Sequence, residues 1–218
     1  AMNWQALLDP DIQKFIQEHE NEDIKALALK KPPQSAWPYA LIMDQIKASQ
    51  KAQKKFPHWN IENIIWPSAD LIEQASSYSC AIFKASISEG KTFVDLTAGS
   101  GIDAYALAQN FENGFAIEKN QASAEILKHN LKVLNNDNIK VYNSSAEDYI
   151  SDMPNVDLVY IDPQRRDSGR RGIYDLKECS PNIIDLIPAL KTKNTLIKTS
   201  PVLDIKKAID KMKCVHHI

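Results

Sequence analysis

Between Gly90 and Lys198, short apolar stretches alternate with longer stretches in which apolar residues recur at helical spacing. We expect strands at Thr92–Leu96, Phe115–Glu118, Ile139–Tyr142, Val156–Ile161 and Thr195–Lys198, and helices at about 102–110, 121–134, 180–190 and 202–213. Short apolar strands separated by helices are typical of a parallel sheet that is covered on both faces. The sequence therefore predicts an α/β fold with a Rossmann-like, doubly wound parallel sheet.

The segment before this region is expected to be helical. Asp9 and Pro10 are typical of a helix start, and apolar spacing predicts one helix over residues 9–30 and a second over Tyr39–Lys55. We interpret residues 1–60 as a small N-terminal helical subdomain and residues 61–218 as the α/β domain, which opens with a helix over Ser68–Ser86. The sequence stops where a further strand would begin, so the C-terminal edge of the sheet is expected to be truncated.

Composition narrows the class of protein. With 44% hydrophobic residues, a chain of 218 residues can bury one substantial core. No apolar run approaches the roughly 20 residues that cross a bilayer, and the N-terminus has no signal-peptide pattern, so we expect a cytoplasmic protein without a membrane partner. Cys214, His216 and His217 lie together but lack a fourth ligand, so we predict no metal site.

The turn from Val94 to Gly101 follows the first expected strand, where open α/β sheets bind their ligands. Glycines in such a turn let the backbone approach a ligand closely. Gly99-x-Gly101-x-x-Ala104, followed later by Glu118, also fits a dinucleotide fingerprint. Asp95 favours another ligand, because a carboxylate beside the glycines would repel a pyrophosphate but can pair with an ammonium group.

These residues resemble the class I S-adenosylmethionine-dependent methyltransferases. Asp95, Gly99 and Gly101 match the acidic-x-x-x-Gly-x-Gly turn of that family, Glu118 matches its second-strand acid, and residues 143–148 match the segment that contacts adenine. The resemblance implies that the cofactor is S-adenosyl-L-methionine. It implies cofactor contacts from Asp95, Thr97, Ala98, Gly99, Gly101, Glu118, Lys119, Ser145, Ala146, Glu147 and Asp162.

After the fourth expected strand comes Asp162-Pro163-Gln164-Arg165-Arg166. This run resembles the Asp-Pro-Pro-aromatic motif of methyltransferases that modify base amines, with Gln164 and Arg165 in place of the second proline and the aromatic residue. The resemblance implies a catalytic role for Asp162, Pro163 and Gln164. A carboxylate and a backbone carbonyl can accept hydrogen bonds from an amine and orient its lone pair toward a methyl donor.

All the arginines of the chain, in contrast to its many lysines, fall in one short window beside this motif: Arg165, Arg166, Arg170 and Arg171. Guanidinium groups bind phosphate in bidentate fashion, so we predict that the window binds substrate phosphates, assisted by Lys198. Internal pairing with Asp167 or Asp175 is the alternative. A further helix either extends this surface or is simply solvated, and its lysines are Lys47, Lys51, Lys54 and Lys55.

The motif order also resembles a bacterial methyltransferase group whose longer members carry a THUMP-like C-terminal domain, a module associated with RNA modification. We therefore favour an enzyme that N-methylates a base in RNA. Two alternatives stay open, a methyltransferase of a small phosphorylated metabolite and a catalytically silent cofactor-binding module that helps a partner bind RNA. The sequence does not indicate an oligomeric state.

Overall fold

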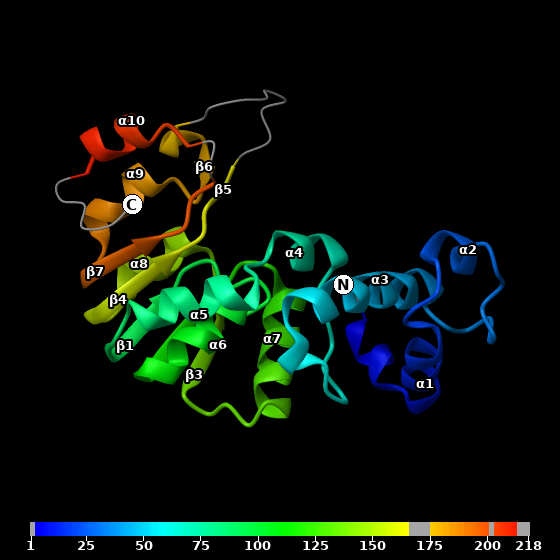
Figure 1. Ribbon diagram of the computed structural model, residues 1–218. Coiled ribbons are helices and arrows are strands. Elements are labelled where there is room, and N and C mark those ends of the chain that lie inside the picture. The colour runs from blue at the N-terminus through cyan, green and yellow to red at the C-terminus, as the bar shows by residue number, and fades with distance from the viewer. Residues whose placement is uncertain (1–2, 166–174, 201–202, 213–218) are drawn as a thin grey trace.

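A computed structural model describes residues 3–165, 175–200 and 203–212, and Figure 1 shows the arrangement of its elements. The central sheet has the strand order β3-β2-β1-β4-β7, and all of its pairings are parallel. Its strands are β1 (Gly90–Asp95), β2 (Phe111–Glu118), β3 (Ile139–Asn143), β4 (Val156–Ile161) and β7 (Thr192–Ile197). The predicted parallel sheet is confirmed, and β4 has the predicted bounds.

Helices cover both faces of this sheet, because successive side chains of a strand point to opposite faces. Phe93 of β1 packs in a cluster with residues of α6 (Ile102–Leu107) and α7 (Gln121–Val133). The next residue, Val94, belongs to a cluster on the other face with residues of α8 (Ala146–Asp152), α9 (Ile183–Leu186) and α10 (Ile205–Asp210). The fold is therefore doubly wound, as predicted.

The N-terminal helices pack against the α/β core. They are α1 (Pro10–His19), α2 (Ile24–Ala28) and α3 (Tyr39–Lys55), and the last has the predicted bounds. Ile42 and Ile46 of α3 share a buried cluster with Ile126 of α7. The indole N–H of Trp4 donates to Glu125 at 3.0 Å. The contacts of α3 extend past residue 60, since Gln45 exchanges hydrogen bonds with the backbone of Trp66, and the domain boundary near residue 60 stays a prediction.

Two predicted helices are each broken into two. Asp9 caps α1 as expected, but the predicted helix over 9–30 was wrong in its length, because Asp23 starts α2 by accepting the N–H of Lys25. The predicted helix over 68–86 is interrupted likewise, because Ser77 caps a new helix. The resulting helices are α4 (Ala69–Gln74) and α5 (Tyr78–Ser86). Local side-chain caps therefore overrode a continuous apolar pattern.

Other elements were missed or differ in length. Helix α8 was not predicted, although Ser145 caps it by accepting the N–H of Asp148 at 3.0 Å. The predicted helices at 180–190 and 202–213 shorten to α9 and α10 among the described residues. Two short antiparallel strands, β5 (Gln164–Arg165) and β6 (Cys179–Ser180), form a separate ribbon. Short 3-10 helices occupy Trp4–Leu8, Pro57–Trp59, Ala108–Asn110, Leu176–Glu178 and Ile187–Ala189.

Candidate functional site

A cavity of about 310 Å³ lies at the carboxyl ends of β1, β2 and β4. Five segments form its wall: the turn after β1, the end of β2, the start of α8, the residues after β4, and the segment from α4 to Ser76. Its lining residues are Ser68, Leu71, Gln74, Ala75, Ser76, Leu96, Thr97, Ala98, Gly99, Ser100, Asp103, Ile117, Glu118, Lys119, Asn120, Ser123, Ser144, Ala146, Glu147, Asp162, Gln164, Ser180 and Pro181. The cavity occupies the crevice in which open α/β sheets bind ligands.

The turn between β1 and α6 depends on its glycines. Gly99 and Gly101 have φ angles of 51° and 84°, in the left-handed region that side chains disfavour. At Gly101 a Cβ atom would also lie 2.2 Å from the side chain of Leu127. The turn therefore keeps its tight path only with glycine at Gly101, and α7 can pack directly beneath it.

Glu118, the last residue of β2, is held in place at the cavity wall. Its carboxylate accepts the N–H of Gly99 at 2.9 Å and the N–H of Asn120 at 2.7 Å. Its side chain is buried at 8% exposure, yet it lines the cavity. Each carboxylate oxygen has a further lone pair, so Glu118 can still accept hydrogen bonds from the hydroxyl groups of a cofactor.

Asp95 lies beneath the cavity and does not line it. The side chain is fully buried, and one oxygen accepts the N–H of Thr97 at 2.9 Å while the other has no partner among the described residues. Burial raises the pKa of Asp95 well above its usual range, and the Thr97 hydrogen bond opposes that rise. Asp95 was predicted to contact the cofactor. Its place at the end of the central strand puts it under the glycine turn, and the contact stays a prediction.

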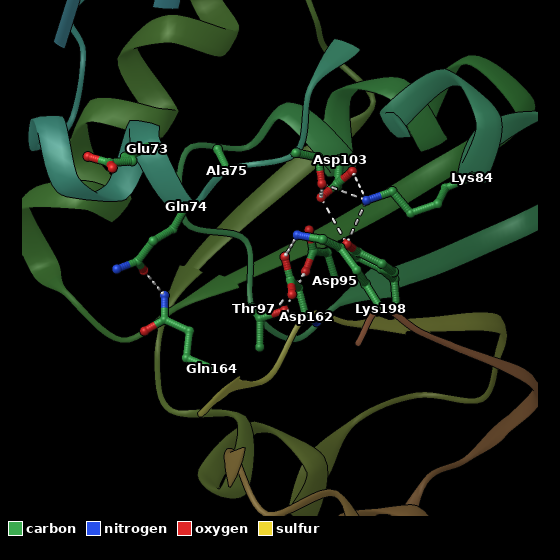
Figure 2. A network of polar contacts seen from close by, with 12 residues as sticks. Glu73, Gln74, Ala75, Lys84, Asp95, Thr97, Asp103, Asp162, Gln164 and Lys198 are labelled. Atoms are coloured by element: carbon green, nitrogen blue, oxygen red, sulfur yellow. Dashed lines mark hydrogen bonds and ion pairs between the residues drawn. The ribbon is translucent and has the colours of Figure 1, made fainter. Parts of the chain in front are cut away.

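A polar network lies beside the cavity and was not predicted from the sequence (Figure 2). Lys84 of α5 forms an ion pair with Asp103 of α6 at 2.5 Å and donates to the hydroxyl of Tyr160 at 2.9 Å. Ser76 and Tyr160 both donate to Asp103 at 2.8 Å. Lys84 is buried and the Asp103 side chain is largely shielded from solvent, so each charge depends on the other for compensation. The network fixes α5, α6 and β4 around the cavity.

Asp162 follows β4 and faces Lys198 (Figure 2). Its carboxylate pairs with the Lys198 ammonium at 2.6 Å, and its backbone N–H donates to the hydroxyl of Thr97 at 2.7 Å. Burial raises the pKa of Asp162, and the neighbouring ammonium acts in the opposite direction. Lys198 was predicted to bind a substrate phosphate; its ammonium here pairs with this carboxylate, and the phosphate contact stays a prediction.

The structure brings together most of the predicted site residues. Those that line the cavity are Thr97, Ala98, Gly99, Glu118, Lys119, Ala146, Glu147, Asp162 and Gln164. Those that do not line it are Asp95, Gly101, Ser145, Pro163 and Lys198. The backbone of Arg165 pairs with that of Cys179 in the β5–β6 ribbon. Arg166, Arg170 and Arg171 lie outside the described residues.

Sequence reasoning missed the wall formed by Gln74, Ala75 and Ser76, since no motif marks this segment. It also missed Asp103 and the pair Ser180 and Pro181. Asp103 could have been predicted to lie at the cavity, because it follows Gly101 by two residues and lies in the first turn of α6. In addition, Asp175, one proposed internal partner of the arginines, pairs with Lys211 at 2.5 Å.

Metal centres and membrane spans have structural signatures of their own. Within residues 3–165, 175–200 and 203–212, no three or more His, Cys, Asp or Glu side chains gather in a way that could hold a metal ion. Cys214, His216 and His217 lie outside those ranges. Over the same ranges, no helix has the length and apolar character needed to span a membrane.

The chain is similar to a known protein family, to a curated protein and to a solved structure. Residues 46–173 match the profile of the family described as conserved hypothetical protein 95. Over 145 residues, the chain is 26% identical to a tRNA/tmRNA (uracil-C(5))-methyltransferase of Shewanella piezotolerans, covering 57% of this chain and 39% of that protein. A "putative methyltransferase" of Porphyromonas gingivalis W83 has a similar crystal structure, with a TM-score of 0.77 and 26% identity. That match covers 97% of this chain and 53% of the other, so the chain spans about half or less of each relative.

Proposed function

The chain belongs to the family described as conserved hypothetical protein 95, and from that membership and the cavity we propose that it is an S-adenosylmethionine-dependent methyltransferase that N-methylates a base in RNA. One observation carries the proposal. Glu118 at the end of β2 and Asp162 at the end of β4 line the same cavity, on either side of the Gly99 turn. In this proposal, Glu118 binds the cofactor and Asp162 binds the methyl acceptor within one crevice.

The residues present fit S-adenosylmethionine. A volume of about 310 Å³ lies within the range of small-molecule sites. Glu118 would accept the ribose hydroxyls, while the small residues Ala98 and Gly99 leave room and Ile117 offers an apolar surface. When bound, this cofactor supplies an electrophilic methyl group on a sulfonium cation. We propose that Ser145, which caps α8, lies beside the adenine of the cofactor.

Charge favours this cofactor over a nicotinamide dinucleotide. Four acidic residues, Asp103, Glu118, Glu147 and Asp162, line the cavity, whereas Lys119 is the one basic residue among its described lining residues. Lys84 and Lys198 compensate Asp103 and Asp162, so the excess negative charge of the wall comes from Glu118 and Glu147. Such a wall repels a pyrophosphate and attracts a sulfonium. The buried Asp95 adds to this preference only if it is ionised, which its raised pKa opposes.

The acceptor side uses Asp162, Pro163 and Gln164. The Asp162 carboxylate and the Pro163 carbonyl would accept hydrogen bonds from a base amine and so orient its lone pair. Lys198 holds the Asp162 carboxylate at 2.6 Å and so limits its rotation. In this proposal, Lys198 therefore positions Asp162, and its contact with a substrate phosphate stays a prediction.

RNA as substrate rests on the likeness to a methyltransferase whose name gives tRNA and tmRNA, and on the arginine window. That relative modifies uracil C5, a carbon that needs a nucleophile to activate the ring. An amine as the acceptor is supported instead by the likeness of Asp162-Pro163 to the motif of methyltransferases that modify base amines. The likeness to the group with a THUMP-like domain points to RNA as well.

The test is transfer of a labelled methyl group from S-adenosylmethionine to RNA extracted from cells that lack the gene. Mass spectrometry of the nucleosides then identifies the modified base. An N-methylated base is expected. If the cofactor binds but RNA receives no methyl group, a metabolite substrate or a silent module replaces the proposal. If 5-methyluridine forms, the amine assignment is wrong.

A further inference from the structure

Two glutamines meet at the acceptor side of the cavity (Figure 2). Gln74 is the last residue of α4, and Gln164 follows β4. The side-chain amide of Gln164 donates to the side-chain carbonyl of Gln74 at 2.7 Å. Both residues line the cavity, and both side chains are exposed. The pair is therefore accessible to a molecule bound in the cavity.

The chemistry of the pair leaves two groups unused. One carboxamide contributes its NH₂ group and the other its carbonyl, so the pair keeps one carbonyl oxygen and one NH₂ group that its own hydrogen bond does not use, whichever way the two amides are turned. A neighbouring acceptor and donor is the pattern with which glutamine reads the edge of a base. A hydrogen bond between two exposed amides contributes little to stability, so stability alone gives no reason for this pair.

Lys55 of α3 binds the backbone on both sides of Gln74. Its ammonium donates to the carbonyls of Ile72 at 3.1 Å, of Ala75 at 3.0 Å, and of Glu73. The last carbonyls of a helix lack partners within that helix, and a lysine can satisfy them. An ammonium has three N–H donors, and here three carbonyls accept them. Lys55 therefore caps the C-terminal end of α4 and has no donor left for a phosphate.

Neighbouring contacts hold the same segment. Lys51 of α3 forms an ion pair with Glu73. On the far side of Gln74, Ser76 donates to Asp103 at 2.8 Å and accepts from Lys84 at 2.7 Å. The wall of the cavity from Gln74 to Ser76 is thus fixed by α3 at one end and by the buried network at the other. Two of the lysines considered for a nucleic-acid surface serve this internal purpose.

We propose that Gln74 and Gln164 act as one pair that contacts the methyl-acceptor base, and that Lys55 is the positioning residue that places Gln74. This inference rests on the proposed function. It assigns to the N-terminal helices a part in substrate selection at the cavity. It also gives a role to Gln164 at the position where the related motif has its second proline.

The first test is Gln74→Glu. The new carboxylate still accepts the Gln164 amide, so the bridge persists while the free NH₂ donor is removed. We expect kcat/KM for RNA to fall at least tenfold and the Kd for S-adenosylmethionine to stay within twofold. Gln109→Glu, at an exposed glutamine of the 3-10 helix after α6, is the matched control. An unchanged kcat/KM in Gln74→Glu would overturn the proposed base contact. A raised kcat/KM in a second variant, Gln74→Ala, would also overturn it, because the Gln74 side chain would then obstruct the RNA instead of binding it.

The second test separates positioning from general stability. Lys55→Met should lower kcat/KM for RNA about as much as Gln74→Glu, and Lys55→Arg should restore most of it. Lys25→Met, at an exposed position of α2, is the control and should change nothing. The double variant Lys55→Met with Gln74→Glu should be no worse than either single variant, because both act through Gln74. Additive losses would overturn the positioning role. If the natural protein methylates no RNA, the proposed function fails, and this inference with it.

Discussion

The backbone N–H of Gly99 donates a 2.9 Å hydrogen bond to the carboxylate of Glu118, which joins the turn after β1 to the end of β2. The same carboxylate accepts the N–H of Asn120, so it holds both turns that form this side of the cavity. The acid that would bind a ribose is therefore already oriented by the chain. Such preorganisation lowers the cost of ordering the site when a ligand binds.

Glu118→Gln should weaken S-adenosylmethionine binding at least tenfold. The amide keeps the size of the side chain, but its NH₂ group faces a backbone N–H, and it loses charge-assisted hydrogen bonds of roughly 1.5 to 3 kcal/mol each. Calorimetric titration measures the change in Kd. Glu112→Gln, an exposed position on the same strand, is the control and should leave Kd unchanged. An equal Kd for both variants would show that Glu118 serves only the fold.

Lys84→Met should destabilise the protein by about 3 to 5 kcal/mol, because the variant leaves the carboxylate of Asp103, only 11% exposed, without its cationic partner. Denaturant unfolding measures the change. Lys14→Met removes an exposed pair with Glu18 on α1 and should have an effect too small to resolve. Similar stabilities for the two variants would mean that the buried network carries no such energy.

Asp95 gives a prediction about pH. Its folded-state pKa is raised, above an unfolded value of about 3.9, so the folded protein holds this proton at pH values where the unfolded chain has released it. Stability should therefore fall as pH rises above about 4, relative to Asp95→Asn, which cannot titrate. The shift includes repulsion from Asp103 and Asp162 and the opposing charge of Lys84. A stability difference that does not vary between pH values of about 4 and 7 would contradict this.

The arginine window can be tested through salt. If these side chains hold phosphates, replacing Arg165 and Arg166 by Lys should weaken RNA binding and leave cofactor affinity unchanged. Replacing all four arginines by Ala should flatten the dependence of log affinity on log salt, by roughly one unit for each phosphate that the variant no longer binds. An unchanged slope together with a lower melting temperature would mean that they pair internally.

Much of the fold follows from local sequence pattern. Buried parallel strands are apolar along their length, which is why β4 was predicted with its observed bounds and the sheet with its class. Helix ends were harder, because Asp23 and Ser77 start new helices inside apolar patterns that look continuous. A cap depends on backbone angles at one residue, and spacing does not report them.

The parts of the candidate site that belong to recognisable sequence motifs were predictable. The glycine turn, Glu118 and Asp162 all lie at strand ends and meet at one edge of the sheet. Gln74 was not predictable, since its place depends on how α4 packs and on the cap from Lys55. Asp95 and Lys198 were assigned ligand contacts from their charge, whereas their burial and pairing depend on neighbours distant in the sequence.

The most direct measurement for the cofactor site is calorimetric titration of the protein with S-adenosylmethionine, its demethylated product and a nicotinamide dinucleotide, each under the same conditions. The acidic cavity predicts saturable 1:1 binding of the first two and no detectable heat from the third. Tight binding of the nicotinamide dinucleotide, with no response to S-adenosylmethionine, would contradict the assignment of this cavity to a methyl donor.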